Sequence, residues 1–145
     1  MIASALHLSK YGDRDQFMVQ ALGEHDEELG AVVVDRVGHN EYVRASKSCM
    51  NDLRGLQRVM SADLLLYVIT NAWVDKEALN TGLGVRLYIE AARVAAGYGG
   101  AIAPHDCAAG ATSAAAQRVW NSKRFGEQIL RVGDVAYWTG LRKHR

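Results

Sequence analysis

Two glycines near the middle of the chain give the clearest chemical signal in the sequence. Residues 79–84, Leu-Asn-Thr-Gly-Leu-Gly, lie between an apolar stretch typical of a strand and an amphipathic stretch typical of a helix. Glycine lets the main chain approach a ligand closely, and the free N–H groups at the start of a helix bind phosphate. The spacing of Gly82 and Gly84 therefore predicts a loop that binds a pyrophosphate group.

His105 and Asp106 are the residues best placed to move a proton near such a site. They follow a short predicted strand at 101–103, and ligands of α/β sheets bind beyond the ends of strands. Because an imidazole titrates near neutral pH, His105 could take a proton from an amine. The alternative is that both residues belong to an ordinary turn after Pro104. Cys107 beside them is interpreted as a small buried residue rather than a nucleophile.

The other histidines are scattered without the spacing of metal ligands, so no metal site is predicted. They are His7, His25, His39 and His144. An acidic group surrounds one of them and consists of Glu24, Asp26, Glu27 and Glu28. Such a group is either a solvated loop or a surface that attracts a cationic amine.

Composition predicts one globular domain spanning residues 1–145. The chain is 49% hydrophobic and 23% charged and contains a single proline, which separates it from disordered and collagen-like sequences. Its net charge of +1 creates no overall field that would favour nucleic acid or a membrane surface as a partner. We therefore expect neither of these partners.

Three further features predict a soluble, cytoplasmic protein. The first residues lack a basic leader followed by an apolar core, so no secretory signal is expected. The longest apolar run, 64–69, falls short of the roughly 18 residues that cross a bilayer. Cys49 and Cys107 are accordingly expected to be reduced thiols.

The second half of the chain has the clearest secondary-structure pattern. Residues 64–74 predict a central strand, because they are apolar on both faces apart from two polar positions. The apolar period then changes from 2 to 3.6, which predicts a helix that ends at 97–100. A short strand at 101–103, a helix from an N-cap at Thr112 or Ser113 to Phe125, and a hairpin of 128–132 with 135–139 should follow.

The first half of the chain is less regular. Residues 30–37 and 41–46 predict a β-hairpin, and a short helix should begin behind a cap at 51–52. Residues 5–8 are expected to form a first strand and 15–22 a helix. The fold class predicted from these elements is α/β.

The order of these elements resembles the GNAT superfamily of acyl-CoA N-acyltransferases over residues 64–139. The turn of that superfamily reads Arg or Gln, two variable residues, Gly, one variable residue, then Gly or Ala. Residues 79–84 match this spacing, and Val74 stands at the usual distance before the turn. The later helix of the superfamily has Asn, Ala, Tyr and a closing aromatic residue, at the places that Ser113, Ala116, Trp120 and Phe125 occupy here.

The resemblance implies a mixed, mostly antiparallel central sheet flanked by helices, with strands that splay apart at the acyl-CoA site. It implies that acetyl-CoA donates an acetyl group to an amine of a small molecule or a protein, without a metal. The residues expected to bind the cofactor are Trp73, Val74, Leu79, Asn80, Thr81, Gly82, Leu83, Gly84, Val85 and Ser113. A main-chain N–H at or near Trp73 would polarise the thioester carbonyl. A homodimer through the edge of the 128–139 hairpin is expected from the habit of the superfamily.

Two residues depart from the superfamily pattern. Leu79 replaces the Arg or Gln of the turn, which removes a polar side chain but leaves the backbone donors in place. Trp120 replaces the Tyr that protonates the leaving thiolate in many members, and an indole N–H is no acid near neutral pH. Catalysis would then depend on direct attack by an amine held close to the thioester, with His105, Asp106 and Trp120 as the candidate catalytic residues.

Three other readings of the sequence stay open. A dinucleotide-binding domain is disfavoured, because Leu87 stands where its third glycine belongs and the turn lies past the middle of the chain. A protein that keeps the GNAT fold but only binds or inhibits is favoured by both departures. An acyltransferase that modifies a nucleic-acid base or a nucleotide, as some virus-encoded relatives of the fold are thought to do, is disfavoured by the near-neutral charge.

Overall fold

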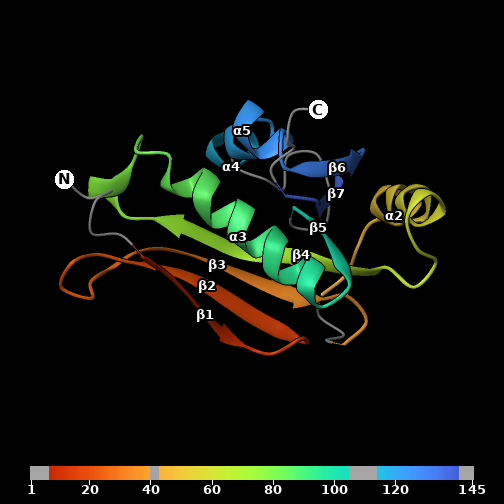
Figure 1. Cartoon of the computed structure of the whole chain (residues 1–145), viewed down its shortest axis with the longest axis horizontal. Coiled ribbons are helices and arrows are strands. Elements are labelled where there is room, and N and C mark those ends of the chain that lie inside the picture. Colours follow the sequence, from red (N-terminus) through yellow and green to blue (C-terminus); the bar gives the residue numbers. More distant parts are fainter. Residues whose placement is uncertain (1–6, 40–42, 105–113, 141–145) are drawn as a thin grey trace.

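Seven strands form one sheet, which runs through the molecule in the computed structural model (Figure 1). The structure describes residues 7–39, 43–104 and 114–140. The strands are β1 (His7–Gly12), β2 (Gln16–Leu22), β3 (Glu28–Arg36), β4 (Leu65–Val74), β5 (Gly100–Ala103), β6 (Ile129–Val132) and β7 (Val135–Trp138). Their order in the sheet is β1-β2-β3-β4-β5-β7-β6. Only the pairing of β4 with β5 is parallel among the described strands, so the sheet is mixed and mostly antiparallel.

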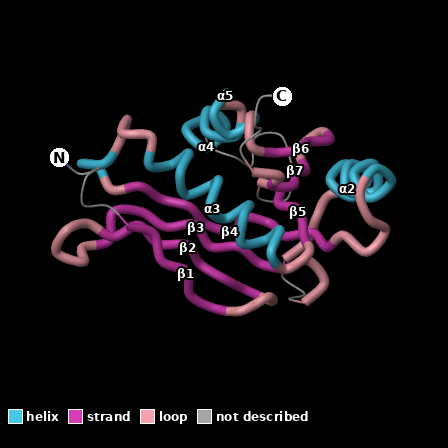
Figure 2. Tube along the Cα trace, in the orientation of Figure 1, coloured by secondary structure: helices cyan, strands magenta, loops and turns pink. Residues whose placement is uncertain are grey.

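The helices lie on both faces of this sheet (Figures 1 and 2). They are α2 (Lys47–Val59), α3 (Leu83–Gly97), α4 (Ala114–Trp120) and α5 (Lys123–Gly126), with a short 3₁₀ helix, η1 (Lys76–Ala78), before α3. The helices α3, α4 and α5 share one hydrophobic core with β2 and β3, and α2 packs in a second core on the other face. None of the helices in the described part of the chain is long and apolar enough to cross a membrane.

The strand β4 contributes to both cores, which explains its apolar sequence. Tyr67 and Ile69 are buried against the α3 core, whereas Leu66 and Val68 are buried against the α2 core. Because successive side chains of a strand point to opposite faces, a strand covered on both sides needs apolar residues throughout. The prediction of a central strand at 64–74 is confirmed, and so is the mixed α/β class.

The predictions for the helix that follows β4 and for the closing hairpin are also confirmed. The helix α3 buries one face, with Leu83, Leu87 and Ala91 among its buried residues, and ends at Gly97. The hairpin of β6 and β7 turns at Gly133. Its strand β6 is the last of the sheet, which leaves an edge free in the part of the chain that the structure describes. The homodimer expected at this edge remains a prediction.

Two predictions for the first 46 residues are wrong. Residues 15–22 were expected to be helical, but 16–22 form β2, in which Phe17, Val19 and Ala21 are buried in alternation. Strand β3 pairs with β2 and β4, whereas a hairpin with 41–46 was predicted; residues 41–42 of that prediction lie outside the described residues. Residues 43–46 form no strand, and Ser46 caps α2.

The start of α2 and the end of α4 also differ from the prediction. The hydroxyl of Ser46 accepts a hydrogen bond from the Cys49 N–H at 3.1 Å, so the helix begins before the cap expected at 51–52. The helix predicted to run to Phe125 is divided in two, because Ser122 caps α5 by accepting from the Phe125 N–H at 3.2 Å. Cys49 is buried and disulfide-bonded, so the expectation of a reduced thiol there is wrong.

Candidate functional site

A cavity of about 520 Å³ lies between the last part of β4, the turn before α3 and the helix α4. Most of the residues predicted to bind the cofactor line it, namely Trp73, Val74, Leu79, Asn80, Gly82, Leu83, Gly84 and Val85. Thr81 is not among the lining residues, and its hydroxyl donates to the carbonyl oxygen of Ala78 at 2.5 Å. The structure therefore brings the two segments of the predicted site, the strand end and the glycine turn, to one cavity.

The strands β4 and β5 separate beside this cavity. Residues 65–68 of β4 pair with β5, which ends at Ala103, and β4 continues alone on that side to Val74 within the described residues. At the same place β4 contains a bulge, because Val33 and Val34 of β3 pair with Asn71 and Ile69 and leave Thr70 between them. A bulge bends a strand and increases its twist. The bulge thus accompanies the opening of the sheet.

The glycine turn has the geometry of an anion site at a helix start. Gly82 adopts a left-handed conformation with φ of 83°, and no side chain caps α3. The first N–H groups of a helix have no partner inside the helix, so the main chain at 83–85 presents donors beside the cavity. A methyl group at Gly84 would lie 3.2 Å from Cγ2 of Val119, so the absence of a side chain there lets α4 approach α3 closely.

Trp120 lies in the core and is absent from the cavity wall. Its side chain is 3% exposed, and its ring packs on Phe125 with centroids 5.0 Å apart and on Tyr88 at 6.2 Å. Its Nε1–H is buried and has no hydrogen-bond partner among the residues that the structure describes. Trp120 is therefore a packing residue, and its placement does not support the catalytic role considered for it.

Tyr88 and Arg118 also line the cavity, and Tyr88 belongs to the hydrophobic core as well. Tyr88 is 6% exposed and packs on Trp120 and Phe125 while it borders the cavity. Burial raises its pKa to about 12, so its hydroxyl stays protonated at neutral pH. The apolar spacing of α3 places Tyr88 beside Leu87 on the inner face, but no local pattern marks the cavity.

The remaining candidates lie outside the described residues. These are His105, Asp106, Cys107 and Ser113. The acidic residues 24–28 form the turn between β2 and β3 and the start of β3. In this turn the carboxylate of Glu27 accepts hydrogen bonds from the backbone N–H groups of Glu27 itself and of His25, and these bonds lower the pKa of Glu27.

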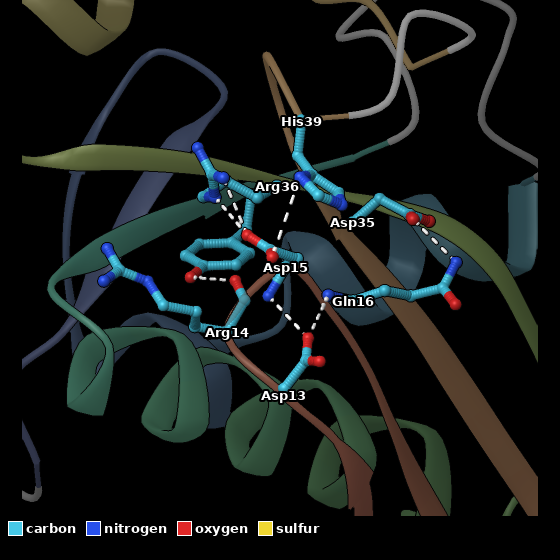
Figure 3. A network of polar contacts seen from close by, with 8 residues as sticks. Asp13, Arg14, Asp15, Gln16, Asp35, Arg36 and His39 are labelled. Atoms are coloured by element: carbon cyan, nitrogen blue, oxygen red, sulfur yellow. Dashed lines mark hydrogen bonds and ion pairs between the residues drawn. The ribbon is translucent and has the colours of Figure 1, made fainter.

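A polar network braces the opposite end of β3 (Figure 3). Asp15 pairs with Arg36 at 2.7 Å, and Nδ1 of His39 lies 3.6 Å from the same carboxylate. Asp35 is 4% exposed and accepts hydrogen bonds from Nε2 of Gln16 and from the hydroxyl of Thr70, both at 2.7 Å. The network therefore reaches the bulge of β4 through a buried carboxylate.

No group of His, Cys, Asp and Glu suited to a metal ion occurs among the residues that the structure describes. The chain was compared with protein-family models and with curated proteins, and neither comparison gave a match.

Proposed function

We propose that the protein is a divergent acyl-CoA N-acyltransferase of the GNAT type, which transfers an acetyl group from acetyl-CoA to an amine. One observation carries the proposal. A single cavity joins an uncapped helix start, with its left-handed glycine, to the stretch of β4 that extends past β5. The first element suits a diphosphate, and the second offers main-chain groups to an extended chain that ends in a thioester.

The cavity wall suits the two chemical halves of such a donor. Apolar side chains dominate it, including Val32, Val74, Leu83 and Val119, and would contact the pantetheine arm. The diphosphate would lie at the N–H groups of 83–85. A main-chain N–H of the free side of β4, at Trp73 or a neighbour, would donate to the thioester oxygen as charge develops on it.

The reaction would proceed by direct attack of the amine nitrogen on the carbonyl carbon. The C–N bond forms, the C–S bond then breaks, its electron pair leaves with the sulfur as a thiolate, and the proton of the nitrogen passes to solvent water. A thiol has a pKa of about 8.5, so the thiolate is a tolerable leaving group near neutral pH without an acid at position 120. Proximity and a polarised carbonyl would supply the rate enhancement.

A non-catalytic binding protein with the same cavity is the second candidate. The burial of Trp120 and the absence of its indole from the cavity favour it, since no residue at that place supplies a proton to the sulfur. The two candidates agree on acetyl-CoA binding and differ only in turnover.

Calorimetric titration with acetyl-CoA tests the shared part of both proposals. Ala72 is exposed on β4 and lines the cavity, so Ala72→Trp should fill the site at little cost to folding and abolish the heat of binding. Asn71→Trp is the matched control, because Asn71 is exposed on the same strand and is not among the lining residues. Absence of binding to the wild-type protein would refute both candidates. Thiol release in the presence of a pool of small amines and proteins then separates enzyme from binder.

A further inference from the structure

One arginine of α5 lies over the glycine turn, and one arginine of α4 lines the same cavity. A methyl group added at Gly82 would lie 3.5 Å from Nη1 of Arg124, so this guanidinium sits directly over the turn. Arg118 lines the same cavity from α4. Both arginines are exposed. The turn and these two side chains come from segments far apart in the sequence.

No acidic side chain forms an ion pair with these arginines within the described part of the chain. The first turn of α3 likewise has no acidic residue. The start of a helix carries a partial positive charge of about half a unit, which repels a guanidinium. An anion bound at the helix start would therefore be attracted by both the helix dipole and the unpaired guanidinium groups.

Tyr88 supplies an independent sign of a polar ligand in the same cavity. Its side chain is more than nine-tenths buried and borders the cavity, and its hydroxyl makes no hydrogen bond to another described residue. The hydroxyl itself is not among the buried atoms that lack a partner, so it is open to the cavity and free to bond a polar ligand group.

We propose that Arg118 and Arg124 bind the diphosphate of the acyl carrier and replace the polar side chain that the turn lacks at Leu79. The inference rests on the proposed function and adds the residues that recognise the charged half of the donor. Guanidinium groups suit phosphate because their planar N–H fork makes paired hydrogen bonds. Leu79 is 55% exposed on the cavity wall and cannot supply such bonds.

Coenzyme A carries a diphosphate and a separate 3′-phosphate, and the two can be distinguished. Arg124 lies over Gly82, where the diphosphate would meet the helix start. The arginines should therefore contribute equally to the binding of coenzyme A and of dephospho-coenzyme A, which lacks only the 3′-phosphate. Inorganic pyrophosphate should compete with both.

The test is calorimetric titration of the full chain with coenzyme A, dephospho-coenzyme A and inorganic pyrophosphate. Arg118→Ala and Arg124→Ala should each raise the Kd of both carriers about 10-fold, and the double variant should raise it more. The salt dependence of binding should weaken in the variants. Arg58→Ala removes an exposed arginine of α2 on the other face of the sheet and should leave binding unchanged. Thermal unfolding of each variant checks that it is folded.

The outcomes separate this inference from the proposed function. If the wild-type protein binds coenzyme A and the double variant binds it equally well, the role of the arginines is refuted and the function stands. A loss confined to coenzyme A, with dephospho-coenzyme A unaffected, would show that the arginines bind the 3′-phosphate and would overturn the assignment to the diphosphate. A wild-type protein that binds neither carrier refutes both proposals.

Discussion

The hydrogen bond between Thr70 and Asp35 should stabilise both the fold and the opening of the sheet. The Thr70 hydroxyl lies 2.7 Å from Oδ2 of Asp35 and 3.3 Å from the carbonyl oxygen of Val33. Its single proton is directed to the carboxylate, which is closer and charged. Thr70→Val keeps the shape of the side chain and deletes this donor, which leaves the buried carboxylate with Gln16 as its remaining side-chain partner in the described structure.

A hydrogen bond to a buried charged group contributes about 1.5–3 kcal/mol. Thr70 is only partly buried, and valine suits a strand, so the lower part of this range is expected. We predict that Thr70→Val lowers the free energy of unfolding by about 2 kcal/mol, measured by urea denaturation at neutral pH. Thr70→Ser keeps the hydroxyl and should cost clearly less.

A double-mutant cycle with Asp35→Asn isolates the pair, with a coupling energy expected above about 1 kcal/mol. If Thr70→Val lowers the free energy of unfolding by less than about 0.5 kcal/mol, or if Thr70→Ser is equally destabilised, the hydroxyl does not stabilise the bulge. If the bulge shapes the thioester end of the cavity, Thr70→Val should also lower kcat for thiol release. In the proposed function the Kd of coenzyme A depends on the glycine turn at the other end of the cavity, so it should change little.

Three further predictions follow from the cavity wall. Leu79→Arg should tighten coenzyme A binding by about 3- to 10-fold in titration calorimetry, while Leu130→Arg, at an exposed leucine outside this cavity, should not. Gly82→Ala forces a left-handed conformation on a residue with a side chain and should cost about 1–2 kcal/mol in urea unfolding. Gly38→Ala is the control, because Gly38 has a similar φ. This variant should cost about the same stability but leave coenzyme A binding intact. Equal loss of binding in the Gly38 and Gly82 variants would refute a specific role for the turn. Burial raises the pKa of Tyr88 to about 12 in the folded protein, whereas the same tyrosine ionises near pH 10 in the unfolded chain. The folded state therefore loses stability relative to the unfolded state as the pH rises from 10 to 12. Tyr88→Phe should remove about 3 kcal/mol of this loss of stability with pH. In an absorbance titration it should also remove the tyrosine that ionises at the highest pH, and an unchanged titration would contradict the burial argument.

Local patterns were sufficient for the elements that build the cavity. In β4 and α3 the apolar period is unambiguous, and the glycine turn separates the two. In the first half the pattern is ambiguous, because Phe17, Met18, Val19 and Ala21 give nearly continuous apolar sequence that fits a helix or a strand. Pairing with β1 and β3 decides the outcome, and that information is not local.

The cavity itself could be predicted only in part, because its wall joins segments that are distant in the sequence. Arg118 is exposed on α4, and only the folded structure shows that this exposed surface borders the cavity. The position of Arg124 over Gly82 depends on the break between α4 and α5 at Ser122, which was not predicted. A hydroxyl that caps a four-residue helix is a weak signal within an apparently continuous helical pattern.

The structural role of Trp120 follows from its neighbours. The rings of Tyr88, Trp120 and Phe125 pack against one another, so they join α3 to both α4 and α5. Arg118 lies in α4, and Arg124 directly precedes Phe125 in α5, so the aromatic cluster holds the helices that carry both guanidinium groups. A tryptophan buries more surface than a tyrosine, and the guanidinium of Arg131 stacks 5.4 Å from its ring. The aromatic cluster therefore fixes the end of the cavity beside both guanidinium groups, which is where the proposed diphosphate would bind.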